Sequence, residues 1–91
     1  MPAKKKEQIK LKFEKNFQGA WTAYAYIISD TKCPAISVSA AMGEKAATAR
    51  PWIQAELDRI CNEYLATLPN AKRVTREEHD AEAERRRKLR Q

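Results

Sequence analysis

The spacing of the hydrophobic residues changes once along this sequence, close to Gly43. Before Gly43, apolar side chains alternate with polar ones, which is the period of a β-strand with one buried face. After it, apolar side chains recur every three or four residues, which is the period of an amphipathic helix. A chain with this one change of period is expected to fold as several strands followed by a helix that covers them.

The alternating region divides into three predicted strands. In residues 8–15, Ile, Leu and Phe alternate with Lys and Glu, so one face of this strand is apolar. Residues 16–19 are typical of a turn, and residues 21–29 are rich in aromatic and β-branched types, which favour a second strand paired as a hairpin. Residues 35–41 alternate again and predict a shorter third strand.

The helical period predicts a long helix after the strands. Thr48 is a good N-cap and would place Pro51 at the third helical position, where the missing N–H costs little. The helix is expected to run to about Leu68, before the helix-stopping pair Pro69 and Asn70. Its apolar face comprises Ile53, Leu57, Ile60, Cys61, Tyr64 and Leu68.

The C-terminal segment predicts a second helix of a different kind. Thr75 and Glu78 have the spacing of a capping box, and Glu82 and Arg86 form a favourable pair four residues apart. Ala81, Ala83 and Leu89 are the only apolar side chains after Thr75. Because so narrow an apolar face cannot dock firmly on a core, we expect this helix to be exposed, frayed or ordered only by a partner.

These elements predict an α+β fold: a small two-layer unit with a three-stranded antiparallel sheet packed by one long amphipathic helix, plus an exposed charged C-terminal helix. The expected organisation is a basic N-terminal tail at residues 1–7, a compact βββα domain at 8–69 and a charged helical extension at 70–91. Ninety-one residues suffice for one such domain.

Composition narrows the class of function. The net charge of +6 sits at the two ends: residues 1–15 hold six Lys against two Glu, and residues 72–91 hold eight Lys or Arg against five Asp or Glu. The apolar-rich stretch at 20–29 is too short for a membrane span, and the N-terminus has no signal-peptide pattern, so we expect a cytoplasmic protein that does not contact membranes.

Catalysis, metal binding and cofactors are not expected. Cys33 and Cys61 are far apart, in no CxxC motif, and are interpreted as reduced thiols. His79 is the single histidine and lies in the charged tail, with no second imidazole at metal-ligand spacing. The sequence therefore predicts no metal, no cofactor and no enzymatic activity.

Residues 8–68 resemble the small HicB-like antitoxin module. The residues that carry the resemblance are Phe13-Glu14-Lys15-Asn16, Gly19-Ala20-Trp21-Thr22-Ala23-Tyr24, Ile36-Ser37-Val38-Ser39-Ala40, Gly43-Glu44 and the helix containing Ile53 and Leu57. The resemblance implies a protein that neutralises a small RNA-cleaving toxin by covering it. In that family a separate C-terminal domain binds DNA, but only about 22 residues follow Pro69 here.

A second resemblance, to the helix-turn-helix of phage small terminases, covers residues 35–53. Its apolar, small, turn and recognition-helix positions are matched by Val38, Ser39, Met42, Gly43, Thr48, Ala49 and Trp52. This alternative implies a DNA-binding regulator, and it replaces the third strand with a helix.

Two binding functions follow as hypotheses. The first is a non-catalytic protein that engages and neutralises a partner protein or nucleoprotein complex, in the manner of an antitoxin or phage inhibitor, with a possible homodimer formed by sheet-edge pairing or by the C-terminal helix. Its expected partner-binding residues are Trp21, Tyr24 and Tyr26. The alternative is a basic protein that binds DNA or RNA through Lys4, Lys5, Lys6, Lys10, Lys12, Arg85, Arg86, Arg87, Lys88 and Arg90.

The pattern of the second strand leaves open which of its faces is buried. Either Trp21, Ala23, Ala25 and Ile27 point outward, or Thr22, Tyr24, Tyr26 and Ile28 do. If the tyrosines point outward, they share a face with Lys10 and Lys12, and such a face could stack unpaired bases.

Overall fold

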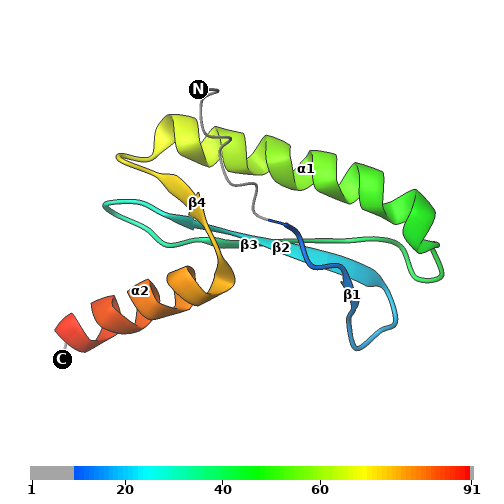
Figure 1. The fold of residues 1–91 in the computed structure, drawn as a ribbon, viewed down its shortest axis with the longest axis horizontal. Helices are drawn as coiled ribbons and strands as arrows, with labels where there is room; N and C mark the ends of the chain where they lie inside the picture. Colours follow the sequence, from blue (N-terminus) through cyan, green and yellow to red (C-terminus); the bar gives the residue numbers. More distant parts are fainter. Residues whose placement is uncertain (1–9, 91) are drawn as a thin grey trace, which may run out of the picture.

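Four strands and two helices make up the fold in the computed structural model, which describes residues 10–90 (Figure 1). In chain order they are β1 (Glu14–Lys15), β2 (Trp21–Ile28), β3 (Ala35–Ser39), α1 (Ala46–Thr67), β4 (Lys72–Val74) and α2 (Arg76–Leu89). The long helix α1 packs along one face of an antiparallel sheet, so the predicted α+β class is confirmed.

The sheet is built around β2, its longest strand. β3 pairs with β2 along one edge, with Ala23 opposite Val38. The other edge of β2 is shared by two short strands, because β1 pairs near its start and β4 near its end. Both pairings are antiparallel. β1 and β4 lie along the same edge of β2, with a gap between them.

The core lies between α1 and the sheet. Ile53, Leu57 and Cys61 recur at helical spacing on the buried face of α1, and Ile27 meets them from β2. The remaining inward positions of β2 and α1 are small, namely Ala23, Ala25 and Ala49. Small side chains at these positions let the helix approach the strand closely, so the core packs without large aromatic residues at its centre.

The structure settles which face of β2 is buried. Trp21, Ala23, Ala25 and Ile27 pack against the core beneath α1. Because side chains alternate along a strand, Thr22, Tyr24, Tyr26 and Ile28 lie on the opposite face. The second of the two alternatives is therefore the one that occurs, and the face with the tyrosines is the one that α1 does not cover.

Helix α2 packs over one end of this second face, on the side of the sheet opposite α1 (Figure 1). His79 is its buried residue: its ring lies 5.1 Å from that of Tyr26, and its Nε2 donates a hydrogen bond of 2.8 Å to the carbonyl oxygen of Cys33. Arg86 donates through Nη2 to the carbonyl oxygen of Ser29. The expectation of a helix with nothing to dock on is wrong, because polar contacts replace the missing apolar face.

The capping box predicted for this helix is confirmed. The hydroxyl of Thr75 accepts a hydrogen bond from the backbone N–H of Glu78, and the carboxylate of Glu78 accepts one from the backbone N–H of Thr75. Most other side chains of α2 are exposed, as the prediction of an exposed charged helix requires. The pKa of Glu78 is lowered mainly by the backbone hydrogen bond from Thr75.

The first strand is much shorter than predicted. Of the predicted residues 8–15, residues 8 and 9 lie outside the described part, and only Glu14 and Lys15 pair with β2. Leu11 and Phe13 still turn inward and pack against the core, as the alternation predicts. The described residues before Glu14 do not pair with β2, which leaves the middle of that edge free.

The start of the long helix also differs from the prediction. α1 begins at Ala46, and the carbonyl oxygen of Lys45 accepts hydrogen bonds from the N–H groups of both Thr48 and Ala49, so Thr48 is not the N-cap. Gly43 adopts a positive φ of 85°, which reverses the chain early enough for the helix to begin sooner. Pro51 is consequently the sixth helical residue and lies beyond the first turn.

Two further features of the structure differ from the sequence-based expectations. The helix-turn-helix over residues 35–53 is wrong, because residues 35–39 form β3, paired with β2. The fourth strand was not predicted at all: β4 falls in the segment assigned to the C-terminal extension. Asn70 has a left-handed φ of 53°, and its side chain donates a hydrogen bond of 2.6 Å to Asp30. This turn folds the chain back from the end of α1, which places β4 beside β2.

Candidate functional site

The gap between β1 and β4 exposes the backbone of one residue of β2. The carbonyl oxygen of Trp21 accepts from Ala40, and the N–H of Ile27 donates to the carbonyl oxygen of Pro34, so odd-numbered residues of β2 direct their backbone groups toward the β3 side. Even-numbered residues therefore direct theirs toward the opposite edge. β1 pairs with Thr22 and β4 with Tyr26, which leaves the N–H and C=O of Tyr24 facing the gap.

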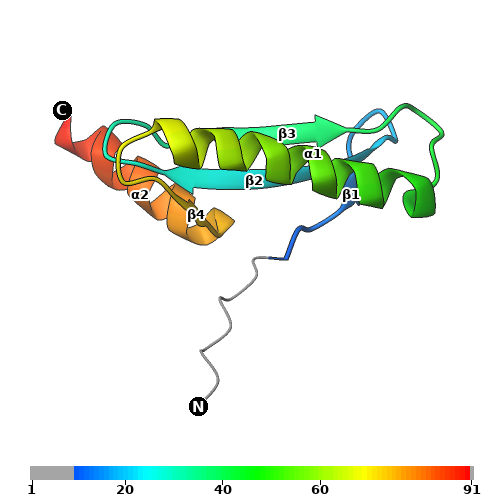
Figure 2. The ribbon, with the colours of Figure 1, turned by 90° about the horizontal axis from the view of Figure 1, so that it is seen from above.

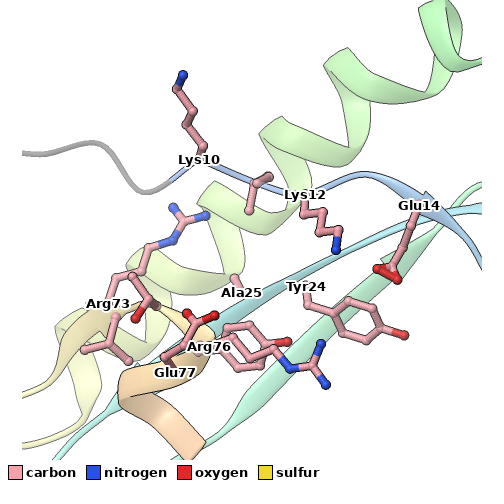
Figure 3. A pocket seen from close by; sticks show the side chains of 12 residues that line it. Lys10, Lys12, Glu14, Tyr24, Ala25, Arg73, Arg76 and Glu77 are labelled. Atoms are coloured by element: carbon pink, nitrogen blue, oxygen red, sulfur yellow. The ribbon is translucent and has the colours of Figure 1, made fainter.

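A cleft of about 550 Å³ occupies this gap (Figure 3). That volume lies within the range of small-ligand sites in proteins, roughly 300 to 1,000 Å³. Three segments far apart in sequence form its walls: the stretch leading into β1, the middle of β2, and β4 with the first turn of α2. Its lining residues are Lys10, Leu11, Lys12, Glu14, Tyr24, Ala25, Tyr26, Arg73, Val74, Thr75, Arg76 and Glu77.

Four of the lining residues are cationic. Within residues 10–90, neither Lys10 nor Lys12 forms an ion pair, and both are exposed. Arg76 is 70% exposed and reaches Asp80 only at 3.6 Å, so its guanidinium remains accessible. In Figure 3, Lys12 and Arg76 extend toward the side chain of Tyr24 from different elements. The cleft therefore has accessible positive charge on two sides.

The fourth cation, Arg73, is held more tightly. Its Nη1 donates to Asp58 of α1 at 2.9 Å, which ties β4 to the helix. Its Nε and Nη2 are buried and have no hydrogen-bond partner among the described residues. A buried donor without a partner costs about 1 to 3 kcal/mol. Arg73 thus brings to the cleft wall two nitrogen atoms whose hydrogen-bonding capacity the described chain does not use.

Two carboxylates balance part of this charge. Glu14 lies at the β1 end of the cleft, and Glu77 lies in the first turn of α2 (Figure 3). Carboxylates accept hydrogen bonds but cannot donate them when ionised. The cleft therefore offers both cationic donors and anionic acceptors, in addition to the free backbone N–H and C=O of Tyr24.

The two tyrosines of β2 differ in accessibility. Tyr24 is 41% exposed, on a part of the face that α2 leaves open. Its cross-strand neighbours there are small, because Ser37 lies opposite Tyr24 and Ser39 opposite Thr22. Tyr26 is partly covered by His79, and burial raises its pKa while Arg76 acts in the opposite direction. Of these two tyrosines, Tyr24 is therefore the one whose ring is open to a ligand.

The structure brings some of the predicted site residues together. Lys10, Lys12, Tyr24 and Tyr26 all line the cleft, as expected if the tyrosines face away from α1. Trp21 does not join them: it packs against the core on the α1 side, with Nζ of Lys15 5.5 Å from its ring centroid. Three further predicted residues, Lys4, Lys5 and Lys6, lie outside the described residues.

The predicted C-terminal basic cluster is separate from the cleft. Arg85 and Arg86 both pair with Glu82, and Arg87 pairs with Glu84, so much of its charge is already matched within α2. Hydrogen bonds from Arg85 and then Arg86 lower the pKa of Glu82 to about 2. Lys88 and Arg90 lie at the exposed end of the helix. At 1.5 Å per residue, this end is roughly 18 to 21 Å from Arg76 along the helix.

The groups that could carry catalysis have structural contacts instead. His79 contacts Tyr26 and the carbonyl of Cys33, and its Nδ1 lies 3.1 Å from Asp80. Burial raises the pKa of the Cys61 thiol, which lies in the core. Across residues 10–90, no group of three or more His, Cys, Asp or Glu side chains is arranged to hold a metal ion.

Arg73, Arg76 and Glu77 are cleft residues that the sequence analysis missed. They follow one another around Thr75, whose capping box was recognised, but the three-residue strand before it was not.

Comparison of the chain with protein-family models, with curated proteins and with solved structures found no match.

Proposed function

We propose that this protein is a non-catalytic binding module that holds unpaired nucleotides of a nucleic-acid strand in the cleft between β1 and β4. The observation that carries the proposal is the open ring of Tyr24 with Lys12 and Arg76 extending toward it (Figure 3). Aromatic side chains stack on bases whatever their sequence, and neighbouring cations hold the backbone phosphates. A single strand of nucleic acid offers both unpaired bases for the ring and backbone phosphates for the cations.

The mixture of charges in the cleft supports a nucleotide over a simple anion. A phosphate alone would be repelled by Glu14 and Glu77, which share the cleft with the cations. A nucleotide presents base amino and imino groups that donate to carboxylates, and phosphate oxygens that accept from Lys and Arg. The N–H and C=O of Tyr24 offer a further donor and acceptor to the edge of an unpaired base.

Several observations support a binding role without catalysis. His79 is 9% exposed and holds α2 to the sheet, so it is poorly placed to act as a general base toward a ligand in the cleft.

No helix among residues 10–90 has the length and apolar character needed to cross a lipid bilayer. We place the binding in the cytoplasm, where nucleic acids are found and where free thiols such as Cys33 and Cys61 stay reduced.

Binding and neutralising a partner protein, in the manner of an HicB-like antitoxin, stays a prediction. Trp21, one of the three residues expected to carry it, packs against the core, and that weakens the case for a protein surface centred on the β2 aromatics. The cleft is lined by four cations and two carboxylates, whereas the buried centre of a protein interface is depleted of charged residues, so its features match nucleotides better than a protein surface.

The test is fluorescence anisotropy with a labelled single-stranded DNA and a labelled single-stranded RNA of mixed sequence, with duplexes as competitors. Tyr24→Ala should weaken single-strand binding about 5- to 150-fold, because stacking contributes roughly 1 to 3 kcal/mol per base. Tyr24→Phe keeps the ring and should bind nearly as well as the unchanged protein. Affinity should also fall steeply as salt is raised.

Charge controls distinguish the cleft from general electrostatics. Lys12→Gln and Arg76→Gln should each weaken binding and reduce its salt dependence. Lys45→Gln removes one exposed positive charge at the start of α1, away from the cleft, and should change little. Equal loss in all three variants, or equal affinity of Tyr24→Ala and the unchanged protein, would contradict the proposal.

A further inference from the structure

Arg73 keeps two hydrogen-bond donors that nothing in the described chain uses. Its Nη1 donates to Asp58, but its Nε and Nη2 are buried and have no partner among residues 10–90. These two nitrogens lie on the same side of the planar guanidinium group, so their N–H groups form a fork of two parallel donors. Buried donors without a partner destabilise the fold, and a ligand that supplies two neighbouring acceptors would remove this penalty.

The donor fork of Arg73 belongs to the wall of the cleft. Arg73 lies opposite Ile27 of β2, so its side chain is on the α1 side of the sheet, and in Figure 3 it extends from β4 toward the stretch before β1. The fork is closed off from water, so a ligand must displace part of the wall to reach it. Residues 10–12 line the cleft without pairing with β2, so no strand hydrogen bonds hold this part of the wall in place.

Glu77 brings the complementary group from another element. Its carboxylate forms no ion pair within residues 10–90. It lies in the first turn of α2, and in Figure 3 its side chain extends into the space beside Arg73 and Ala25. Leu11 and Ala25 add apolar surface to the same cleft. The cleft therefore combines an unused donor fork, an unpaired acceptor and apolar surface on which a flat ring can rest.

We propose that the cleft selects guanine, with O6 and N7 of the base bound by Arg73 and its N1 and N2 groups bound by Glu77. This inference rests on the proposed function, because it names the base that a nucleotide-binding cleft would prefer. Guanine has two neighbouring acceptors on one edge and two neighbouring donors on another. Adenine sets a donor beside N7 and would oppose the fork, and the pyrimidines carry their polar groups on one edge only.

The guanine would not be the base that stacks on Tyr24. Arg73 lies on the α1 side of the sheet, whereas the ring of Tyr24 lies on the face that α1 does not cover. The two groups therefore bind different nucleotides of one strand. Stacking on Tyr24 tolerates any base, and Arg73 adds the choice of guanine at the neighbouring position.

Base analogues test the proposal on the unchanged protein. The probe is a labelled single-stranded DNA of thymines with one central guanine, and its competitors carry thymine, adenine, 7-deazaguanine or hypoxanthine at that position. The guanine strand should bind about 5- to 150-fold more tightly than the thymine strand, which is the range that a bidentate Arg contact with guanine gives. 7-Deazaguanine lacks the N7 acceptor and hypoxanthine lacks the N2 donor, so each should lose part of this preference.

Two variants assign the contacts to their residues. Arg73→Lys keeps the charge beside Asp58 but loses the fork, so it should bind the thymine strand normally and no longer distinguish guanine from 7-deazaguanine. Glu77→Ala should no longer distinguish guanine from hypoxanthine. Arg59→Lys, on the outer side of α1, is the matched control and should keep both preferences. If Arg73→Lys does not fold, the analogues on the unchanged protein decide the matter.

Equal affinity of the unchanged protein for the guanine and thymine strands would overturn this inference and leave the proposed function standing. Failure to bind either strand would overturn both. Guanosine monophosphate should compete far more weakly than the guanine strand, because it cannot occupy Arg73 and the ring of Tyr24 together. Equal competition would assign the cleft to a free guanine nucleotide and contradict the proposed binding of a strand.

Discussion

The two faces of the sheet are covered in opposite ways. On one face, α1 lies along the sheet with a continuous stripe of buried residues, Ala49, Ile53, Leu57 and Cys61. On the other, α2 crosses only one end and contributes a single buried side chain, His79 (Figure 2). Apolar burial is non-directional and scales with area, whereas the contacts of α2 depend on a few hydrogen bonds of defined geometry.

This difference accounts for the location of the candidate site. The apolar stripe of α1 holds the helix along the face of the sheet that it covers. A helix held through His79 and Arg86 covers only the end of the sheet where their partners lie, so Tyr24 stays accessible beside the cleft. We expect α1 to determine global stability and α2 to determine how much of the second face is exposed.

The largest expected effect is at the α1 face. Leu57→Ala removes a fully buried side chain and should lower the free energy of unfolding by about 2 to 5 kcal/mol. Chemical denaturation followed by circular dichroism measures it. Leu65→Ala, at an exposed position of the same helix, should cost far less. Similar losses in both variants would mean that α1 is not held by its apolar stripe.

A smaller and more local effect is expected at the α2 face. His79→Ala removes the contact with Tyr26 and the hydrogen bond to Cys33, and should cost about 1 to 2 kcal/mol. Hydrogen exchange should become faster in α2 while β2, β3 and α1 keep their protection. Lys88→Gln, at the exposed end of α2, is the control and should leave exchange unchanged. Loss of protection throughout the sheet would show that the two faces are not independent.

The smallest expected effect is a dependence on acid. Hydrogen bonds from Arg85 and Arg86 lower the pKa of the Glu82 carboxyl to about 2. The ionised carboxylate therefore stabilises α2 to its full extent above pH 4.5, the ordinary pKa of a Glu side chain. This contribution is lost as the pH falls from about 4.5 to about 2, because protonation removes the charge that holds Arg86. After correction for the intrinsic exchange rate at each pH, the protection of α2 should therefore fall over this range, and the fall should be reduced in Glu82→Gln. Glu63→Gln, in a pair on α1, should respond like the unchanged protein.

The fold could be predicted where a repeating pattern existed. Aromatic and β-branched residues located β2, the period of two located β3, and the period of three to four located α1 to within three residues at its start and one at its end. β4 could not be found this way, because three residues are too few to show a period, and it forms only because Asn70 turns the chain back beside β2. The length of β1 was overestimated because its alternation reflects the burial of Leu11 and Phe13, not pairing.

The site was predictable only in part for the same reason. Lys10 and Lys12 were singled out by their alternation, and Tyr24 by its place on β2. Arg76 joins them through the unpredicted strand, so no local pattern indicates it. Arg85, Arg86 and Arg87 form a run of charges in the sequence, but carboxylates three and four residues before them pair with their guanidinium groups.

Nuclear magnetic resonance tests the central claim most directly, by titrating the ¹⁵N-labelled full chain with a short single-stranded oligonucleotide and following each backbone amide. The account predicts that the largest shifts occur at Tyr24, Lys12 and Arg76, with little change along the buried face of α1. Tyr24 is the most informative of these, because its own N–H faces the cleft. Shifts confined to the end of α2, or none at all, would contradict the account.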